Sequence, residues 1–251
     1  MKFGLTGHPI EHSLSPALFK AGYDGRYPYE LIVTPDFEEA YQIFLKEYDG
    51  INVTAPFKEL AIQKADILSD ECKTVGATNL LVKTPEGIKA YNSDFLGVRS
   101  WLSGVSRSVR VLIVGAGGAG KAAAAAADSL GMETVRMNRT QYSIDIKPLS
   151  QFREEFRKAD IIIYCLPVRI EELDALSTED FCPGKPKIIM EANYRNPSFD
   201  EKLIRRMQEA NAMIRYTDGR TWLLHQAVEG YGILTGESPD KNRMEAVINS
   251  K

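Results

Sequence analysis

The sequence has few of the features that mark a membrane or secreted protein. No apolar run approaches the roughly 20 residues that a membrane-spanning helix needs. The first residues, MKFGLTGHPI, lead directly into a strand-like segment and lack the long apolar core of a secretion signal. Cysteine is scarce: Cys72, Cys165 and Cys182 are odd in number and lack metal-ligand spacing. This usage predicts reduced thiols and no metal site, so we expect a cytoplasmic protein.

Excess positive charge is also missing. The 251 residues include 31 Lys and Arg against 34 Asp and Glu, and the basic residues are spread along the chain. This gives no basis for a nucleic-acid partner. The hydrophobic share of 44% and the charged share of 26% are ordinary for a globular protein. The length suits one large domain or two modest ones.

The first hundred residues alternate expected strands and helices. The patterns predict strands at 2–6, 29–34, 50–53, 79–83 and 88–91, and helices beginning at Ser15, at 36–48 and at 57–68. In this interpretation Ser15 caps its helix and Pro16 occupies the first turn. Thr84-Pro85-Glu86-Gly87 predicts a hairpin between the last two strands. The pattern favours a mixed sheet, antiparallel at the hairpin.

The second half is typical of a doubly wound parallel sheet. Strands are expected at 111–114, 134–137, 161–165 and 187–190, and helices at 94–103, 119–130, 149–157, 199–210, 222–234 and 240–250. We therefore predict an α/β protein of two domains. A discontinuous mixed α/β domain, 1–103 with 220–251, would bind substrate, and a Rossmann-type domain, 104–219, would bind a dinucleotide.

A glycine-rich turn lies between a strand and a helix in the second half. Gly115, Gly117 and Gly120 fit the pattern G-x-G-x-x-G, and Ala116, Gly118 and Ala119 complete the segment. The three glycines permit a tight turn, close approach of a pyrophosphate, and close packing of the helix on the sheet. The helix amino terminus directs N–H groups at the phosphates. The alternative interpretation is a tight turn without a ligand.

The end of the next strand predicts which dinucleotide binds. An NAD site usually places an acid there to hold the ribose 2′-hydroxyl. This chain has Asn138, Arg139 and Thr140 instead. The arginine would attract a 2′-phosphate, and its neighbours would add neutral hydrogen bonds. The sequence therefore favours NADP over NAD, the alternative being an arginine that is only solvated.

Four polar residues of the first half suggest a substrate site. Ser13 and Ser15 are two apart, so in an extended segment both hydroxyls would face one side and hold a carboxylate. Lys58 follows a short apolar strand, and Asp94 follows another. An amine and a carboxylate upstream of a dinucleotide turn suggest an acid/base pair. Taken alone, Lys58 reads as a surface lysine, and Asp94 as a residue near a helix cap.

Together these segments resemble the shikimate dehydrogenase family, whose members are NADP-dependent enzymes of the pathway to aromatic amino acids. The resemblance covers almost the whole chain. It rests on HSLSP, NVTAPFK, Gly76-Ala77-Thr78-Asn79, Asn92-Ser93-Asp94, VGAGGAGKA, Asn138-Arg139-Thr140, Tyr194 with Pro197, and Gly219 with Gln226-Ala227, in that order.

The resemblance implies specific roles for these residues. It implies that Ser13 and Ser15 bind the substrate carboxylate, that Thr54, Lys58, Asn79 and Asp94 surround the ring hydroxyls, and that Tyr194 and Gln226 close the pocket. On the cofactor side it implies contacts from Asp70, the glycine-rich turn, Asn138 to Thr140, and Gly219 at the nicotinamide end. The implied reaction interconverts shikimate and 3-dehydroshikimate with NADP and without a metal. Its implied acid/base pair is Lys58 and Asp94. The implied oligomeric state is a monomer or a homodimer.

Departures from the family pattern lie mostly on the cofactor side. Ser93 replaces a threonine, Ser143 stands where a second arginine is common, and Ala192 stands where a methionine is common. Two rival hypotheses remain open: a quinate/shikimate dehydrogenase with broader substrate or NAD use, and a cofactor-binding sensor without activity. A folate-linked dehydrogenase of similar architecture lacks support from HSLSP.

Overall fold

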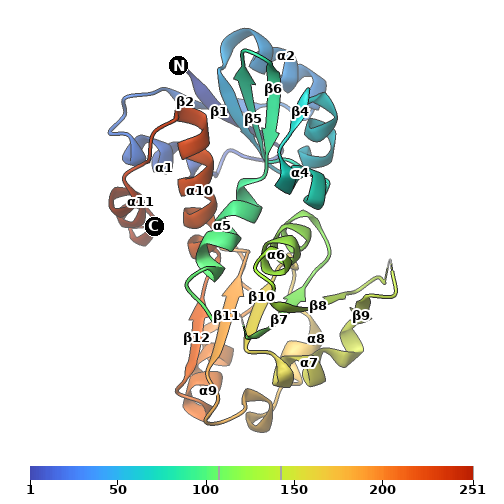
Figure 1. Cartoon of the computed structure of the whole chain (residues 1–251). Helices are drawn as coiled ribbons and strands as arrows, with labels where there is room; N and C mark the ends of the chain where they lie inside the picture. Colours follow the sequence, from blue (N-terminus) through green and yellow to red (C-terminus); the bar gives the residue numbers. More distant parts are fainter. Residues whose placement is uncertain (107, 142, 251) are drawn as a thin grey trace. The chain divides into compact units, whose positions relative to one another are not determined.

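The computed structural model describes residues 1–106, 108–141 and 143–250 (Figure 1). The chain forms two compact units, Met1–Gly97 with Leu224–Lys251, and Val98–Leu223. Both junctions fall inside helices, α5 (Ser93–Leu102) and α10 (Gly219–Thr235). The domain limits expected from the sequence, 103/104 and 219/220, lie at the ends of the same two helices.

The first unit is built on a mixed sheet, as the sequence predicted. Its strand order is β2-β1-β3-β5-β6-β4. Strands β1, β2 and β3 are parallel, β5 is antiparallel to both β3 and β6, and β4 is parallel to β6. The predicted hairpin is β5–β6. The strand bounds are β1 Phe3–Gly7, β2 Tyr29–Val33, β3 Gly50–Val53, β4 Ile67–Leu68, β5 Leu80–Thr84 and β6 Gly87–Tyr91.

Helices cover both faces of this sheet, and the alternating residues of β3 contact helices on each side. Ile51 and Val53 join an apolar cluster with residues of α2 and α3. On the other face, a Cβ on Gly50 would lie 2.5 Å from the Leu234 side chain in α10. The remaining helices are α1 (Ser15–Gly22), α2 (Phe37–Glu47), α3 (Lys58–Ala61), α4 (Asp70–Val75) and α11 (Lys241–Asn249), with a 3-10 turn at Ile62–Lys64.

Two local predictions for this unit were wrong. The helix expected over 57–68 is limited to α3 and the 3-10 turn, because Ile67 and Leu68 pair with β6 as β4. Ser15 is the first residue of α1 rather than its cap. The cap position is Leu14, and the Ser15 N–H donates to the Ser13 hydroxyl at 3.2 Å.

The second unit contains the predicted parallel sheet. Its order is β12-β11-β10-β7-β8-β9, and every pair is parallel. Counted from β7, this is the 3-2-1-4-5-6 order of dinucleotide-binding sheets. The strands are β7 Arg110–Val114, β8 Glu133–Asn138, β9 Ile146–Pro148, β10 Ile161–Tyr164, β11 Lys187–Glu191 and β12 Ile214–Thr217. Sequence reasoning missed β9 and β12.

The alanine-rich helix α6 (Gly118–Ser129) follows β7 and packs against β7 and β8. Alanines 122–127 are all buried, and their small side chains let the helix approach the sheet closely. The other helical segments are α7 (Phe152–Lys158), α8 (Glu171–Asp174) and α9 (Glu201–Ala210), with 3-10 turns at Leu149–Gln151 and Thr178–Phe181.

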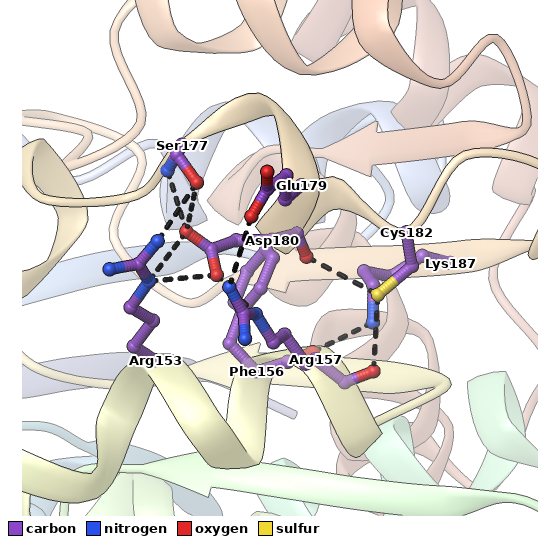
Figure 2. A network of polar contacts seen from close by, with 8 residues as sticks. All are labelled: Arg153, Phe156, Arg157, Ser177, Glu179, Asp180, Cys182 and Lys187. Atoms are coloured by element: carbon purple, nitrogen blue, oxygen red, sulfur yellow. Dashed lines mark hydrogen bonds and ion pairs between the residues drawn. The ribbon is translucent and has the colours of Figure 1, made fainter.

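A buried polar network lies near the amino-terminal end of β11 (Figure 2). The Asp180 carboxylate is fully buried and accepts hydrogen bonds from Arg153, Arg157 and Ser177. These donors hold the pKa of Asp180 well below its usual range against the opposing effect of burial. Lys187, 2% exposed, donates to the carbonyls of residues 156 and 159 at the end of α7. The network fastens α7 to the sheet.

Candidate active site

The topology of the first unit brings the predicted substrate residues to one edge of its sheet. The carboxyl ends of β1, β3 and β6 lie at the same edge as the amino end of β5, because β5 alone runs antiparallel to its neighbours. Residues at this edge follow or precede those strand ends: Ser13 and Ser15 after β1, Thr54 and Lys58 after β3, Asn79 before β5, and Asp94 after β6.

Lys58 and Asp94 form a close ion pair at this edge. The Lys58 Nζ lies 2.6 Å from the Asp94 Oδ2. The lysine side chain is 23% exposed and that of the aspartate 9%, so solvent reaches the amine more readily than the carboxylate. Charge-assisted hydrogen bonds of this length are strong. The pair can hold a proton and exchange it with a hydroxyl presented from the solvent side.

The position of Asp94 is fixed by its neighbours at the start of α5. The Asn92 side chain accepts from the Phe95 N–H at 3.0 Å and donates to the Ala77 carbonyl at 2.9 Å. The Ser93 N–H donates to the Asn79 Oδ1 at 2.7 Å. Asp94 is the second residue of the helix, where the helix dipole favours a carboxylate.

Gln226 reaches the same cluster through Ser93, whose hydroxyl lies 2.9 Å from the Gln226 Oε1. Helices α5 and α10 approach closely here, because a Cβ on Gly97 would lie 2.5 Å from the Gln226 backbone nitrogen. Sequence reasoning noted Ser93 only as a replacement for threonine and missed this contact. Its place in the Asn92-Ser93-Asp94 segment, directly before the predicted site residue Asp94, was the available signal.

The serine segment is not extended, so the reasoning that placed both hydroxyls on one side was wrong. Leu14 has helical backbone angles, and the Ser13 hydroxyl accepts the Ser15 N–H. Ser15 is 8% exposed. The Tyr231 hydroxyl donates to the Ser15 carbonyl at 3.1 Å. On the adjacent strand end, Thr54 packs against Gly7, where a Cβ would lie 2.3 Å from the threonine methyl.

In the second unit, the glycine-rich segment has the shape that a dinucleotide requires. Gly115 has a φ of +115°, and a Cβ on Gly120 would lie 1.9 Å from the Gly115 carbonyl oxygen. Gly117, the cap of α6, faces open space. The turn follows β7, the strand next to the switch point of the sheet, where such sheets bind ligands. These residues therefore fit a dinucleotide pyrophosphate.

The end of β8 is hydrogen-bonded to that turn, and the residues after it include the exposed Arg139. The Asn138 Oδ1 accepts the Ala116 N–H at 3.3 Å, and its Nδ2 donates to the Thr140 carbonyl at 2.9 Å. Arg139 and Thr140 are exposed. Ser143, where a second arginine is common, donates to Asp145. An exposed guanidinium at this point of the chain is the kind of group that can bind a phosphate.

The remaining predicted residues lie in different places. Asp70, predicted on the cofactor side, begins α4 in the first unit, where it is exposed and pairs with Lys73 at 2.9 Å. Asp70 and the glycine-rich turn therefore belong to different units. Tyr194 and Gly219 do meet in the second unit, because a Cβ on Gly219 would lie 2.6 Å from the Tyr194 nitrogen.

Within residues 1–106, 108–141 and 143–250, no cluster of three His, Cys, Asp or Glu residues has the arrangement of a metal site. Over the same part of the chain, none of the helices is both long and apolar enough to cross a bilayer. The groups considered for the candidate site are the Lys58–Asp94 ion pair and the glycine-rich turn.

The fold and these groups define a class: an α/β oxidoreductase with one unit of dinucleotide-binding fold and a second unit that contains a close lysine–aspartate ion pair. A model of the shikimate dehydrogenase substrate binding domain matches residues 5–81. A model of the D-isomer specific 2-hydroxyacid dehydrogenase NAD binding domain matches residues 90–218. The two matches thus cover two separate segments of the chain.

Full-length relatives specify the family. A Pyrococcus furiosus protein named shikimate dehydrogenase (NADP(+)) is 31% identical, with 98% of this chain and 94% of the relative covered. One of the same name from Staphylococcus epidermidis is 30% identical, with 100% and 98% covered. The chain therefore belongs to the shikimate dehydrogenase family, as the sequence resemblance predicted.

Solved structures agree in fold. Shikimate 5-dehydrogenase from Thermus thermophilus, in complex with NADP(H) and shikimate, has a TM-score of 0.84 at 26% identity, with 100% of this chain and 99% of that chain covered. A quinate dehydrogenase from Corynebacterium glutamicum, in complex with NAD, has a TM-score of 0.82 at 20% identity, with 100% and 99% covered. The second likeness concerns the fold alone.

Proposed function

We propose that this chain is an NADP-dependent shikimate dehydrogenase, which reversibly reduces 3-dehydroshikimate to shikimate in the pathway to aromatic amino acids. The observation that carries the proposal is the 2.6 Å contact between Lys58 and Asp94, in a chain that also contains a dinucleotide turn. Family membership supplies the substrate class, because relatives over the full length are named shikimate dehydrogenase.

The substrate roles that we propose are those implied by the family resemblance, and most of these residues lie at one edge of the first sheet. We assign the substrate carboxylate to Ser13 and Ser15, and the ring hydroxyls to Thr54, Lys58, Asn79 and Asp94. We also assign substrate contacts to Gln226 and to Tyr194. The hydrogen bonds around Asn79 and Gln226 support this assignment, because they fix both amides relative to the start of α5.

In the reaction, Lys58 exchanges a proton with the oxygen of the reacting carbon. In the direction of reduction its ammonium donates the proton to that oxygen, and in the direction of oxidation its amine takes the proton back. Asp94 keeps the amine in place by its hydrogen bond and compensates the charge of the ammonium form. The cofactor, when bound, supplies the hydride in its reduced form, NADPH, and accepts it in its oxidised form, NADP⁺.

On the cofactor side, the glycine-rich turn, Gly115 to Gly120, would hold the pyrophosphate, and Asn138, Arg139 and Thr140 the 2′-phosphate end. Gly219 would lie at the nicotinamide. We also assign Asp70, a residue of the first unit, to the cofactor. The single exposed arginine of this segment supports NADP, and Ser143 in place of a second arginine makes the selectivity worth measuring.

The proposal is tested by following the absorbance of reduced nicotinamide with the purified full chain, using shikimate or quinate, each with NADP or NAD. We expect turnover with shikimate and NADP, and a kcat/KM about 10- to 100-fold lower with NAD, the value of one charge-assisted hydrogen bond. Faster turnover of quinate with NAD would identify the broader enzyme instead. Cofactor binding without turnover of either substrate would identify a sensor.

The partners that we propose are small molecules only, in a monomer or a homodimer, and sedimentation of the purified protein would decide between these two states. Among the described residues, Cys72, Cys165 and Cys182 form no disulfide, which fits the cytoplasm that we propose as the location.

A further inference from the structure

A buried carboxylate lies at the carboxyl end of β11, held by hydrogen bonds. Glu191 is fully buried. Its carboxylate accepts the N–H of Ser198 and, at 3.3 Å, the N–H of Phe199. It also accepts the Tyr216 hydroxyl at 2.8 Å. Among the described residues it has no ion pair. An ionised group in such a place is costly unless its hydrogen bonds are well made, so its geometry is narrowly defined.

These hydrogen bonds close a short loop. The loop, residues 192–197, leaves β11 at Glu191 and returns to the same carboxylate at Ser198. Inside it the Asn193 side chain accepts the Arg195 N–H at 3.1 Å and donates to the Asn196 carbonyl at 2.9 Å. The loop is therefore fixed at both ends by one side chain and in its middle by another. Tyr194 lies within it.

The same carboxylate also connects to the start of α10. Tyr216 belongs to β12, three residues before Gly219. Gly219 packs directly on the loop, because a Cβ there would lie 2.6 Å from the Ala192 carbonyl oxygen and from the Tyr194 nitrogen. Burial and the neighbouring Glu191 both raise the pKa of Tyr216, so its hydroxyl remains a donor. One buried group thus joins the two segments that contain Tyr194 and Gly219.

We propose that Glu191 is a positioning residue for the reaction: through the Tyr216 hydroxyl and the loop N–H groups, it sets the places of Tyr194 at the substrate and Gly219 at the nicotinamide. The inference rests on the proposed function. It assigns no direct contact with substrate or cofactor to Glu191. Its effect is on catalysis, because small displacements of positioning groups cost much of the rate.

The main variant is Tyr216→Phe, which removes one donor and leaves the two loop bonds and the ring in place. We expect kcat/KM for shikimate to fall about tenfold, while the affinity for 2′,5′-ADP, a fragment without nicotinamide, changes less than about twofold. Unchanged kcat/KM would overturn the proposal. An equal loss of affinity for the fragment would also overturn it, because it would indicate general loosening of the unit.

Asp180→Asn provides a matched control, since Asp180 is an equally buried carboxylate of the same unit near the opposite end of β11 (Figure 2). It should lower stability but leave kcat/KM of the folded enzyme unchanged. A double-mutant cycle adds a test of mechanism. If Tyr216 acts partly through the loop, its replacement should cost less in a Tyr194→Phe background than in the wild type, because one of the two positioned groups is already altered. Full additivity would contradict the proposal.

Hydrogen exchange separates this inference from the proposed function, because it needs no substrate. In Tyr216→Phe the amides of 192–199 should exchange about tenfold faster than in the wild type, with those of 177–187 unchanged. Unchanged exchange in 192–199 would overturn the positioning role. If the wild type lacks activity with shikimate while Tyr216→Phe still exchanges faster at 192–199, the proposed function is refuted. The inferred anchoring of the loop would still stand.

Discussion

Replacing Lys58 with alanine should lower turnover far more than substrate affinity. The amine lies 2.6 Å from Asp94 and is 23% exposed, so it is placed to exchange a proton with a bound hydroxyl. Loss of general acid/base assistance lowers kcat about 10²- to 10⁴-fold, which corresponds to about 3–5 kcal/mol in the barrier. Loss of one hydrogen bond to substrate, worth about 1 kcal/mol, raises KM about fivefold.

The assay follows reduced nicotinamide over a range of shikimate concentrations at saturating NADP. Lys64→Ala is the matched control, because the Lys64 Nζ lies 2.6 Å from Glu38 in an exposed pair close to Lys58 in the chain. It should change neither kcat nor KM. If Lys58→Ala raises KM and leaves kcat intact, Lys58 is only a binding residue. If both variants lose kcat equally, the reasoning fails altogether.

Three further predictions concern the cofactor, the start of α5 and a buried amine. Arg139→Ala should weaken NADP binding about 10- to 100-fold with little effect on NAD; equal losses for the two cofactors in a fluorescence titration would refute the phosphate contact. Asn92→Ala should lower the free energy of unfolding by about 2 kcal/mol, because α5 loses its cap bond to the Phe95 N–H and a buried carbonyl loses its donor; a change under about 0.5 kcal/mol in urea denaturation would show that neither bond matters. Burial lowers the pKa of Lys187 from 10.5 to about 8. Between these pH values the unfolded chain binds more protons than the folded one, so stability should rise with pH by up to about 3 kcal/mol; urea denaturation at several pH values should show the rise in the wild type and not in Lys187→Met, and equal slopes would refute it.

The cofactor turn could be predicted from the sequence because its requirements are local. A buried strand, closely spaced glycines and an alanine-rich helix follow one another without interruption. The contact that demands glycine, 1.9 Å between a Cβ on Gly120 and the Gly115 carbonyl oxygen, joins residues five apart. No long-range information is needed to specify such a turn, so the pattern alone was sufficient.

The neighbourhood of Lys58 and Asp94 required a topological step. The two residues are 36 positions apart, and only the arrangement of strands brings them together. The hairpin turn that ends at Gly87 makes β5 and β6 antiparallel. Since β5 is also antiparallel to β3, the carboxyl ends of β3 and β6 lie at the same edge of the sheet. The sequence predicted this pair from residue types and family resemblance alone, and the strand directions in the structure explain why the two side chains meet.

The wrong predictions arose where local and long-range preferences compete. Ser13 and Ser15 both suit a helix start, and the sequence does not say which hydroxyl accepts the free N–H group; the turn at Leu14 assigns it to Ser13. The expected helix over 57–68 ends early because Ile67 and Leu68 gain strand pairing with β6. Apolar residues near a helix end serve either structure, so only the partner strand decides.

Glu191 could not be recognised from the sequence, because an acid that ends an apolar strand usually reaches solvent. The structure places charged groups in the interior at both ends of β11, and each is compensated by backbone groups. At the amino end, the ammonium of Lys187 satisfies carbonyls at the end of α7. At the carboxyl end, the carboxylate of Glu191 satisfies N–H groups of a loop. Ligands of such sheets bind at the carboxyl ends of the strands, so the same kind of compensation should affect stability at one end and catalysis at the other.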